Sequence, residues 1–176
     1  LMIDVQGRVW TQAIKMMDEF DKWNFDIFKY QSILGDASLL HFGMKLFQQY
    51  GLLEKFSISD NNFKSLLNSI KGECYETTQY HNILRVIDTT RNFHYFVKYG
   101  ELMTHLSDLQ VMAGFLSALL HDVAHPGVNN NFLIGIKHQK ALRYNDISVL
   151  EHHHCSIAFK LLLDPKNDIF ELLSEA

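Results

Sequence analysis

Three side chains with metal-binding chemistry stand close together at the end of an apolar stretch: His121, Asp122 and His125. Borderline divalent metals bind imidazole nitrogen together with carboxylate oxygen, and one carboxylate can bridge two ions. The sequence therefore suggests part of a metal site. A plainer interpretation also holds, because a histidine at a helix C-terminus is stabilised by the helix dipole when it is protonated. These residues alone leave both interpretations open.

Two further segments carry the same side-chain types. His81, Arg85 and Asp88 are spaced i, i+4 and i+7, so they share one face of the helix predicted there. A buried polar face of this kind needs partners. Glu151 and the three histidines that follow it stand at the head of another predicted helix. A histidine run by itself is more typical of a solvated face, but three such segments in one small chain favour a common site.

The elements that must position these residues are predicted to be helices. Apolar residues recur at helical spacing, strand-like alternation is scarce, and the two prolines fall at 126 and 165, so the sequence predicts an all-α fold. Ser107 and Gln110 form a capping-box pattern, and Gly51 suits a helix end. The segment from Trp23 to Phe28 is expected to be an aromatic anchor. Helices are predicted over about Arg8–Phe20, Ser38–Tyr50, the stretch after Ser59, Tyr80–Lys98, the stretch from Ser107 to Asp122, Phe132–Gly135 and Ser148–Leu162.

Composition limits the classes of partner. The chain has 176 residues and a formal net charge of −4, with scattered Lys and Arg, so nucleic acid and anionic membranes are not expected partners. The apolar run Val111–Leu120 is shorter than the roughly 18 residues that a membrane-spanning helix needs. The N-terminus lacks a secretion signal. Cys74 and Cys155 are expected to be buried and reduced, which predicts an intracellular, cytoplasmic protein.

Longer motifs point to a known family. The segments WNFDIF (23–28), YHN (80–82), HDVAHPGVNNNFL (121–133) and YNDISVLEHHH (144–154) resemble, in order, the class I 3′,5′-cyclic nucleotide phosphodiesterases. The resemblance runs through nearly the whole chain, so we expect residues 1–176 to form a multi-helix phosphodiesterase-like catalytic domain, incomplete at its C-terminal side. It implies hydrolysis of cAMP or cGMP to the 5′-monophosphate by two metal ions, zinc and magnesium or manganese.

The resemblance also assigns roles to residues. It implies that His81 is the general acid and that His121 and Asp122 are metal ligands, with Asp122 bridging the two ions. His125 and Glu151 resemble the residues that hold the water ligands of the metals. Structural or supporting roles are implied for Asn82, Asp88 and Asn130.

Arg85 departs from the family pattern, which has a metal-ligating histidine at this position. A guanidinium has no lone pair for a cation and stays protonated at physiological pH, so Arg85 cannot be a ligand. Its charge should repel a divalent ion, and it could pair with Asp122 or with Asp88 instead. The departure predicts impaired catalysis and puts occupancy of the metal sites in doubt.

A second departure concerns length. Domains of the family are about twice as long, and the metal-ligating aspartate and the base-binding glutamine of their second half are absent from this chain. The chain is expected to be either the retained part of a longer protein or a half-domain that a partner completes. In a half-domain we expect Val149, Leu150, Ile157 and Leu161 to lack cover and to favour a protein partner or an oligomer. The main alternative to a cyclic nucleotide phosphodiesterase is a non-catalytic structural or scaffold subunit. A weaker one is a metal-dependent phosphohydrolase acting on another nucleotide, against which the YHN and YND elements speak.

Overall fold

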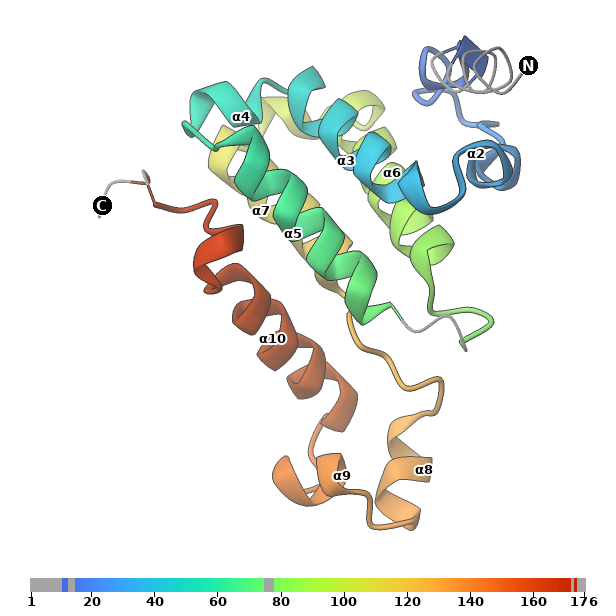
Figure 1. Ribbon diagram of the computed structural model, residues 1–176, viewed down its shortest axis with the longest axis vertical. Helices are drawn as coiled ribbons and strands as arrows, with labels where there is room; N and C mark the ends of the chain where they lie inside the picture. Colours follow the sequence, from blue (N-terminus) through green and yellow to red (C-terminus); the bar gives the residue numbers. More distant parts are fainter. Residues whose placement is uncertain (1–10, 13–14, 75–77, 172, 174–176) are drawn as a thin grey trace, which may run out of the picture.

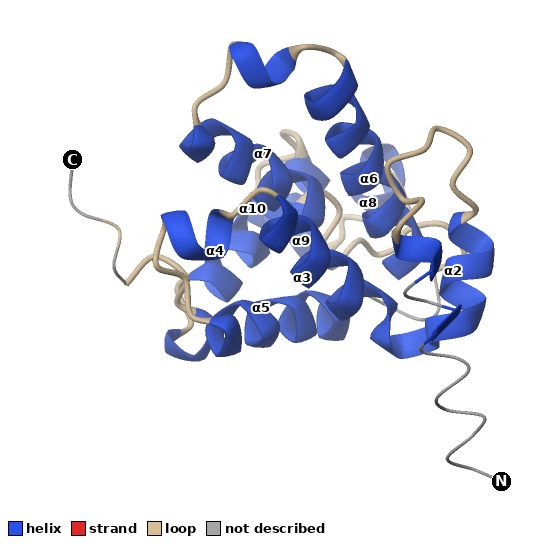
Figure 2. Ribbon diagram, turned by 90° about the horizontal axis from the view of Figure 1, so that it is seen from above, coloured by secondary structure: helices blue, strands red, loops and turns tan. Residues whose placement is uncertain are grey.

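The fold is all-helical, as the sequence predicts. A computed structural model describes residues 11–12, 15–74, 78–171 and 173, and these contain helices and no strand (Figure 1 and Figure 2). Of the helix predicted over Arg8–Phe20, residues 1–10 and 13–14 lie outside the described part. The helices are α2 (Ile27–Leu34), α3 (Ser38–Gln49), α4 (Leu52–Lys55), α5 (Asp60–Glu73), α6 (Ile83–Tyr99), α7 (Asp108–Leu120), α8 (Asn130–Gly135), α9 (Gln139–Arg143) and α10 (Val149–Leu162).

Helices α3, α5, α6 and α7 pack side by side as the main bundle (Figure 1). Its centre is aromatic: the Phe47 ring lies 4.0 Å from that of Phe63 and 6.4 Å from that of Phe115, and all three side chains are fully buried. Helix α3 approaches α5 closely at Gly43, where an added Cβ would lie 2.7 Å from a methyl carbon of Leu67. The bundle therefore has little room for change between these two helices.

Local sequence signals set several helix ends. The capping box predicted at Ser107 is present, because its hydroxyl accepts from the Gln110 backbone and the Gln110 side chain accepts from the Ser107 backbone. Gly51 has a positive φ of 64°, which suits its position just after α3. At the start of α6, the Asn82 side chain accepts a hydrogen bond from the backbone N–H of Arg85.

A second, smaller core lies apart from the bundle. It comprises Leu133, Ala141, Val149 and Leu150, and it joins α8, α9 and the start of α10 at one end of the molecule (Figure 1). The expectation that the apolar face of α10 lacks cover is therefore wrong: Val149, Leu150 and Leu161 are buried and Ile157 is half-buried. These side chains are covered by α8, α9 and the main core. The exposed large apolar residues here are instead Phe159, within α10, and Leu163, directly after the end of the helix.

The segment before α2 is fastened to the C-terminal half of α6. Arg91 donates to the backbone carbonyls of Phe20 and Lys22, and the buried His94 lies with Nε2 2.6 Å from Oδ1 of Asp21. Lys98 completes the set with an ion pair to the same carboxylate. Arg91, His94 and Lys98 recur at helical spacing, so one face of α6 holds three consecutive residues of the segment.

Two expectations about individual side chains are corrected. The aromatic anchor is only partly buried, because Trp23 and Phe28 are exposed, although the ring of Trp23 contacts that of Tyr95 at 5.0 Å. Both cysteines are free, but Cys155 is exposed and Cys74 is half-buried. Helical spacing explains why Cys155 is exposed, because it places this side chain on the face of α10 that lines a pocket rather than on the face that packs in the core. Among the described residues, no helix combines the length and the apolar character needed to cross a bilayer.

Candidate metal-dependent active site

His81 and Asp122, which lie 41 positions apart in the chain, meet in the structure. His81 directly precedes the N-cap of α6, Asp122 follows the end of α7, and Nδ1 of His81 lies 2.9 Å from Oδ2 of Asp122. Burial alone would raise the pKa of Asp122, but the hydrogen bond from His81 and the charges of neighbouring imidazoles hold it below its usual range. Asp122 is thus an ionised carboxylate that orients the His81 ring.

His121 combines both interpretations offered by the sequence. It is the C-cap of α7, and its Nδ1 lies 2.9 Å from the carbonyl oxygen of Ala118. Because a carbonyl only accepts, Nδ1 carries the proton in the neutral ring and Nε2 carries the lone pair. This Nε2 is buried, has no hydrogen-bond partner, and lies 3.1 Å from Oδ2 of Asp122. The helix-capping bond therefore leaves the second ring nitrogen of His121 beside a carboxylate oxygen.

His125 packs directly against His81. The two rings are stacked at 3.5 Å, and the ring of His154 follows at 5.4 Å on the other side of His125. The backbone N–H of Gly127 donates to Nδ1 of His125 and fixes its ring. Burial and the adjacent charge of His81 lower the pKa of His125 to about 4, so His125 is neutral at physiological pH.

Glu151 enters the same region from the first turn of α10. Its Oε2 accepts a hydrogen bond of 3.0 Å from the side-chain amide of Asn130, and this bond is the main cause that lowers the pKa of Glu151. The carboxylate is exposed and ionised. It adds negative charge to the polar region formed by His121 and Asp122.

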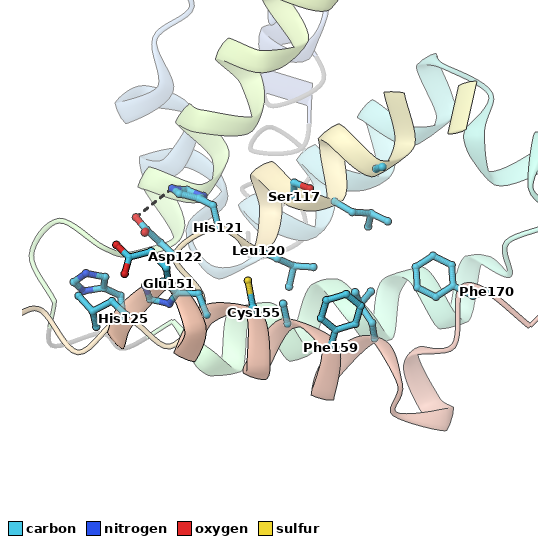
Figure 3. A pocket seen from close by; sticks show the side chains of 15 residues that line it. Ser117, Leu120, His121, Asp122, His125, Glu151, Cys155, Phe159 and Phe170 are labelled. Carbon is cyan, nitrogen blue, oxygen red and sulfur yellow. Dashed lines mark ion pairs between the residues drawn. The ribbon is translucent and has the colours of Figure 1, made fainter. Parts of the chain in front are cut away.

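A pocket of about 560 Å³ opens along these residues between α7 and α10. His121, Asp122 and Glu151 lie toward one end, while Phe159 and Phe170 line the other (Figure 3). A cavity of this size with a few polar groups at one end is typical of a small-molecule site. The pocket could therefore hold a ligand with a charged group and a flat, less polar part.

The predicted site residues divide into two groups. His121, Asp122, His125 and Glu151 line the large pocket, and His81 contacts it through Asp122. Asn82, Arg85 and Asp88 instead line a separate pocket of about 250 Å³ next to Tyr80 and α2.

Arg85 makes one of the two pairings that the sequence allows. Its Nη1 lies 3.9 Å from Oδ2 of Asp88, and its guanidinium carbon lies 5.2 Å from the centre of the Tyr80 ring. No ion pair between Arg85 and Asp122 occurs in the described part of the chain. The arginine removes a possible ligand, but its charge is directed to Asp88 and Tyr80.

Sequence reasoning missed part of the pocket. His154, Cys155, Phe159 and Leu162 line it from α10, and Leu116 and Ser117 line it from α7. The signal was present, because residues 154, 155, 158, 159 and 162 lie at helical spacing from Glu151 and so share its face of α10.

The donors present fit one edge of a metal site. His121 Nε2 and Asp122 Oδ2 are a nitrogen and an oxygen 3.1 Å apart, which are the two kinds of ligand atom that zinc and related ions bind. Within the described ranges, no group of three or more His, Cys, Asp or Glu side chains is placed to hold a metal ion. Further ligands would have to come from water, from substrate or from other protein groups.

Comparison with known proteins identifies relatives of the whole arrangement. Residues 80–176 match the family described as 3′5′-cyclic nucleotide phosphodiesterase. The 3′,5′-cyclic-AMP phosphodiesterase 4C of Mus musculus is 36% identical over 163 residues, which cover 93% of this chain and 24% of the relative. The dual specificity calcium/calmodulin-dependent 3′,5′-cyclic nucleotide phosphodiesterase 1 of Drosophila melanogaster is 35% identical over 163 residues, covering 92% and 20%.

A solved structure shows the same fold. The phosphodiesterase domain of the RhoPDE fusion protein from the choanoflagellate Salpingoeca rosetta superposes with a TM-score of 0.71 at 27% sequence identity, covering 80% of this chain and 42% of that one. The chain thus spans less than half the length of each of these relatives.

Proposed function

Since this chain belongs to the 3′5′-cyclic nucleotide phosphodiesterase family, we propose that it forms the N-terminal part of a catalytic domain that hydrolyses cAMP or cGMP. The observation that carries the proposal is the pair His121 and Asp122, whose Nε2 and Oδ2 atoms lie 3.1 Å apart in the polar part of the pocket. This pairing of chemistry and cavity suits a phosphate group with an attached base. The proposed reaction adds one water and gives the 5′-monophosphate.

In this proposal His81 is the general acid. Its Nδ1 donates to Asp122, so the ring is held and Nε2 carries the proton for transfer. Hydrolysis forms a bond from water oxygen to phosphorus, releases one proton of that water to solvent, and breaks the bond from phosphorus to O3′. His81 gives its proton to O3′ as this bond breaks, while the Asp122 carboxylate holds the ring in place.

His121 and Asp122 would hold the metal ions. Bound divalent ions supply charge stabilisation for phosphoryl transfer and lower the pKa of bound water. Zinc with magnesium or manganese fits the nitrogen and oxygen donors of the chain. His125 would orient water by donating from Nε2, and Glu151 would do so by accepting at its carboxylate.

Arg85 is proposed to weaken this site by withholding a ligand. Because its guanidinium is engaged by Asp88 and Tyr80, the loss of a donor matters more than repulsion. The same residue favours a second candidate function, a non-catalytic structural subunit that keeps the fold of an enzyme. Either protein is proposed to work inside the cell, where cyclic nucleotides are made and used.

An assay of cAMP and cGMP hydrolysis decides between these functions. It would use the protein in the form in which its source makes it. The assay would supply Zn²⁺ with Mg²⁺ or Mn²⁺ and measure the 5′-monophosphate, with His81→Asn as the matched variant. Product formation that falls at least 100-fold in His81→Asn supports the enzyme. A folded protein that yields no product from either nucleotide, with or without His81, supports the structural subunit and excludes the enzyme.

A further inference from the structure

Asn130 connects two helices that both border the pocket. It is the first residue of α8, and its side chain reaches the first turn of α10. Its Nδ2 donates to Oε2 of Glu151 at 3.0 Å, and its Oδ1 accepts from the backbone N–H of Leu150 at 2.9 Å. The nitrogen and the oxygen of one side-chain amide therefore make hydrogen bonds with two consecutive residues of α10.

Helix α10 lacks a cap from its own N-cap residue. Ser148 has φ 40° and ψ 52°, a left-handed conformation that serine rarely adopts, and its side chain makes no capping hydrogen bond. The first N–H groups of a helix have no partner within the helix and need an acceptor from elsewhere. The side-chain oxygen of Asn130 accepts from the backbone N–H of Leu150. Asn130 therefore caps α10 from α8, in place of the N-cap residue Ser148.

The same side chain limits where Glu151 can point. Glu151 is exposed, and a glutamate on an open helix turn has several rotamers available. Within the described residues, the bond from Asn130 is the one hydrogen bond that the Glu151 carboxylate accepts from another side chain. A carboxylate that faces His121 and Asp122 across a pocket needs such a constraint to keep one position.

The neighbouring asparagines do not share this role. Asn129 caps α8 by accepting from the backbone N–H of Phe132, and Asn131 is exposed with no side-chain hydrogen bond found in the described part of the chain. Asn130 alone of the three reaches across to α10. The run therefore contains one local cap, one bridge between helices and one solvent-facing residue.

We infer that Asn130 is a positioning residue, whose amide oxygen caps α10 and whose amide nitrogen holds Glu151 toward the His121 and Asp122 donors. The effect of Asn130 on catalysis rests on the proposed function. The two hydrogen bonds of its side chain are present in the structure whatever the function is. The two halves of the amide have separable effects, because an aspartate at this position keeps the capping oxygen and loses the donor.

Two substitutions separate these effects. In Asn130→Ala both bonds are lost, so we expect the thermal midpoint to fall by about 3 to 6 °C. In Asn130→Asp the cap remains, and a carboxylate near the helix N-terminus is favoured by the dipole, so the midpoint should stay within about 2 °C of the parent protein. Hydrolysis should fall about 10- to 100-fold in both variants, as for other residues that orient active-site groups. Asn131→Ala is the control and should change neither property.

A spectroscopic readout tests the bond to Glu151 without any metal or substrate. The side-chain amide cross-peaks of Asn130 in a ¹⁵N correlation spectrum are assigned by their loss in Asn130→Ala. Glu151→Ala should shift them toward the values of a solvated amide. The inference is overturned if Glu151→Ala leaves these cross-peaks in place, or if Asn130→Asp hydrolyses cyclic nucleotide at the parent rate.

The two proposals fail in different ways. A parent protein that hydrolyses neither nucleotide contradicts the proposed function, while the amide cross-peaks and the thermal midpoints still decide whether Asn130 holds Glu151. An active parent protein with an active Asn130→Asp variant contradicts the positioning role and leaves the proposed function standing.

Discussion

The imidazole rings of His81 and His125 lie face to face, with their centres 3.5 Å apart and their planes 9° from parallel. Two rings this close are unfavourable when both are charged, and burial together with the charge of His81 lowers the pKa of His125 to about 4. The carboxylate of Asp122 contacts His81 directly. The stack therefore keeps His125 neutral beside His81, the ring that the proposed reaction uses as an acid.

Stability should fall as the solution is acidified below neutral pH. Burial and the nearby charge of Lys140 lower the pKa of His153 to about 4, compared with 6.5 for an exposed histidine. Between these values the unfolded chain binds more protons, so the stabilisation is complete above pH 6.5 and is lost as the pH falls toward 4. We expect a loss of about 1 to 2 kcal/mol from His153 between pH 7 and pH 5.

Urea unfolding at several pH values measures this effect. His153→Gln should flatten the dependence of the free energy of unfolding on pH, whereas replacement of the exposed His105 by Gln should leave the slope unchanged. A His153→Gln variant with the slope of the parent protein would show that another group is responsible.

Removal of the Asp21 side chain should loosen the segment before α2. Asp21→Ala leaves the buried His94 and the Lys98 ammonium without their carboxylate, which we expect to cost about 1 to 3 kcal/mol. Trp23 reports the change locally because its ring contacts Tyr95. Its emission, recorded with Trp10 replaced by Phe, should become more quenchable by acrylamide. Asp18→Ala, at an exposed position three residues earlier in the segment, is the control and should leave both measurements unchanged.

Substitution of Arg85 should separate the loss of a metal ligand from the presence of a charge. Arg85→His adds an imidazole donor, whereas Arg85→Gln only removes the charge. Because the guanidinium is held by Asp88 and Tyr80, we expect Mn²⁺ to bind roughly 10-fold more tightly to Arg85→His and nearly unchanged to Arg85→Gln. Isothermal titration would measure both. Equal gains in the two variants would mean that repulsion by the guanidinium dominates instead.

The two cysteines should react at different rates. Cys155 is exposed and lines the pocket, whereas Cys74 is half-buried and burial raises the pKa of its thiol to about 11. The thiolate is the reactive form, so Cys155 should be alkylated by iodoacetamide at least 10-fold faster than Cys74 at pH 8. Mass spectrometry of peptides from a time course gives both rates, and Cys155→Ser identifies the faster one.

Much of the fold was predictable because its signals are local. The capping box at Ser107, the glycine at 51 and the apolar stripe of α5 each depend on residues within one or two helical turns. Helices α4 and α9 were not predicted because they are short, with four and five residues, and have no full stripe. Helix α2 was read as an aromatic anchor, although its N-cap Asp26 accepts from the backbone N–H of Lys29.

The sequence pointed to residues that the structure places close together, but it did not give their arrangement. Of the residues that the motifs selected, His121, Asp122, His125 and Glu151 line one pocket and His81 contacts Asp122 beside it. The sequence could not choose between Asp88 and Asp122 as the partner of Arg85, because the choice depends on side-chain rotamers and on the exposed ring of Tyr80. Nor could it show that α8 and α9 cover the start of α10, since that contact belongs to no single helix.

The two separate hydrophobic cores bear on how the pocket behaves over time. His121 and Asp122 follow α7 of the main bundle, whereas Glu151 stands on the first turn of α10, whose Val149 and Leu150 belong to the small core. A core of four residues buries far less apolar surface than the bundle, so it should open more often by local unfolding. Amide hydrogens of α8 and α9 should then exchange with solvent while those of α7 stay protected. The pocket would thus open and close when the small core, with the first turn of α10, unfolds and refolds locally. This motion would be faster than unfolding of the whole bundle.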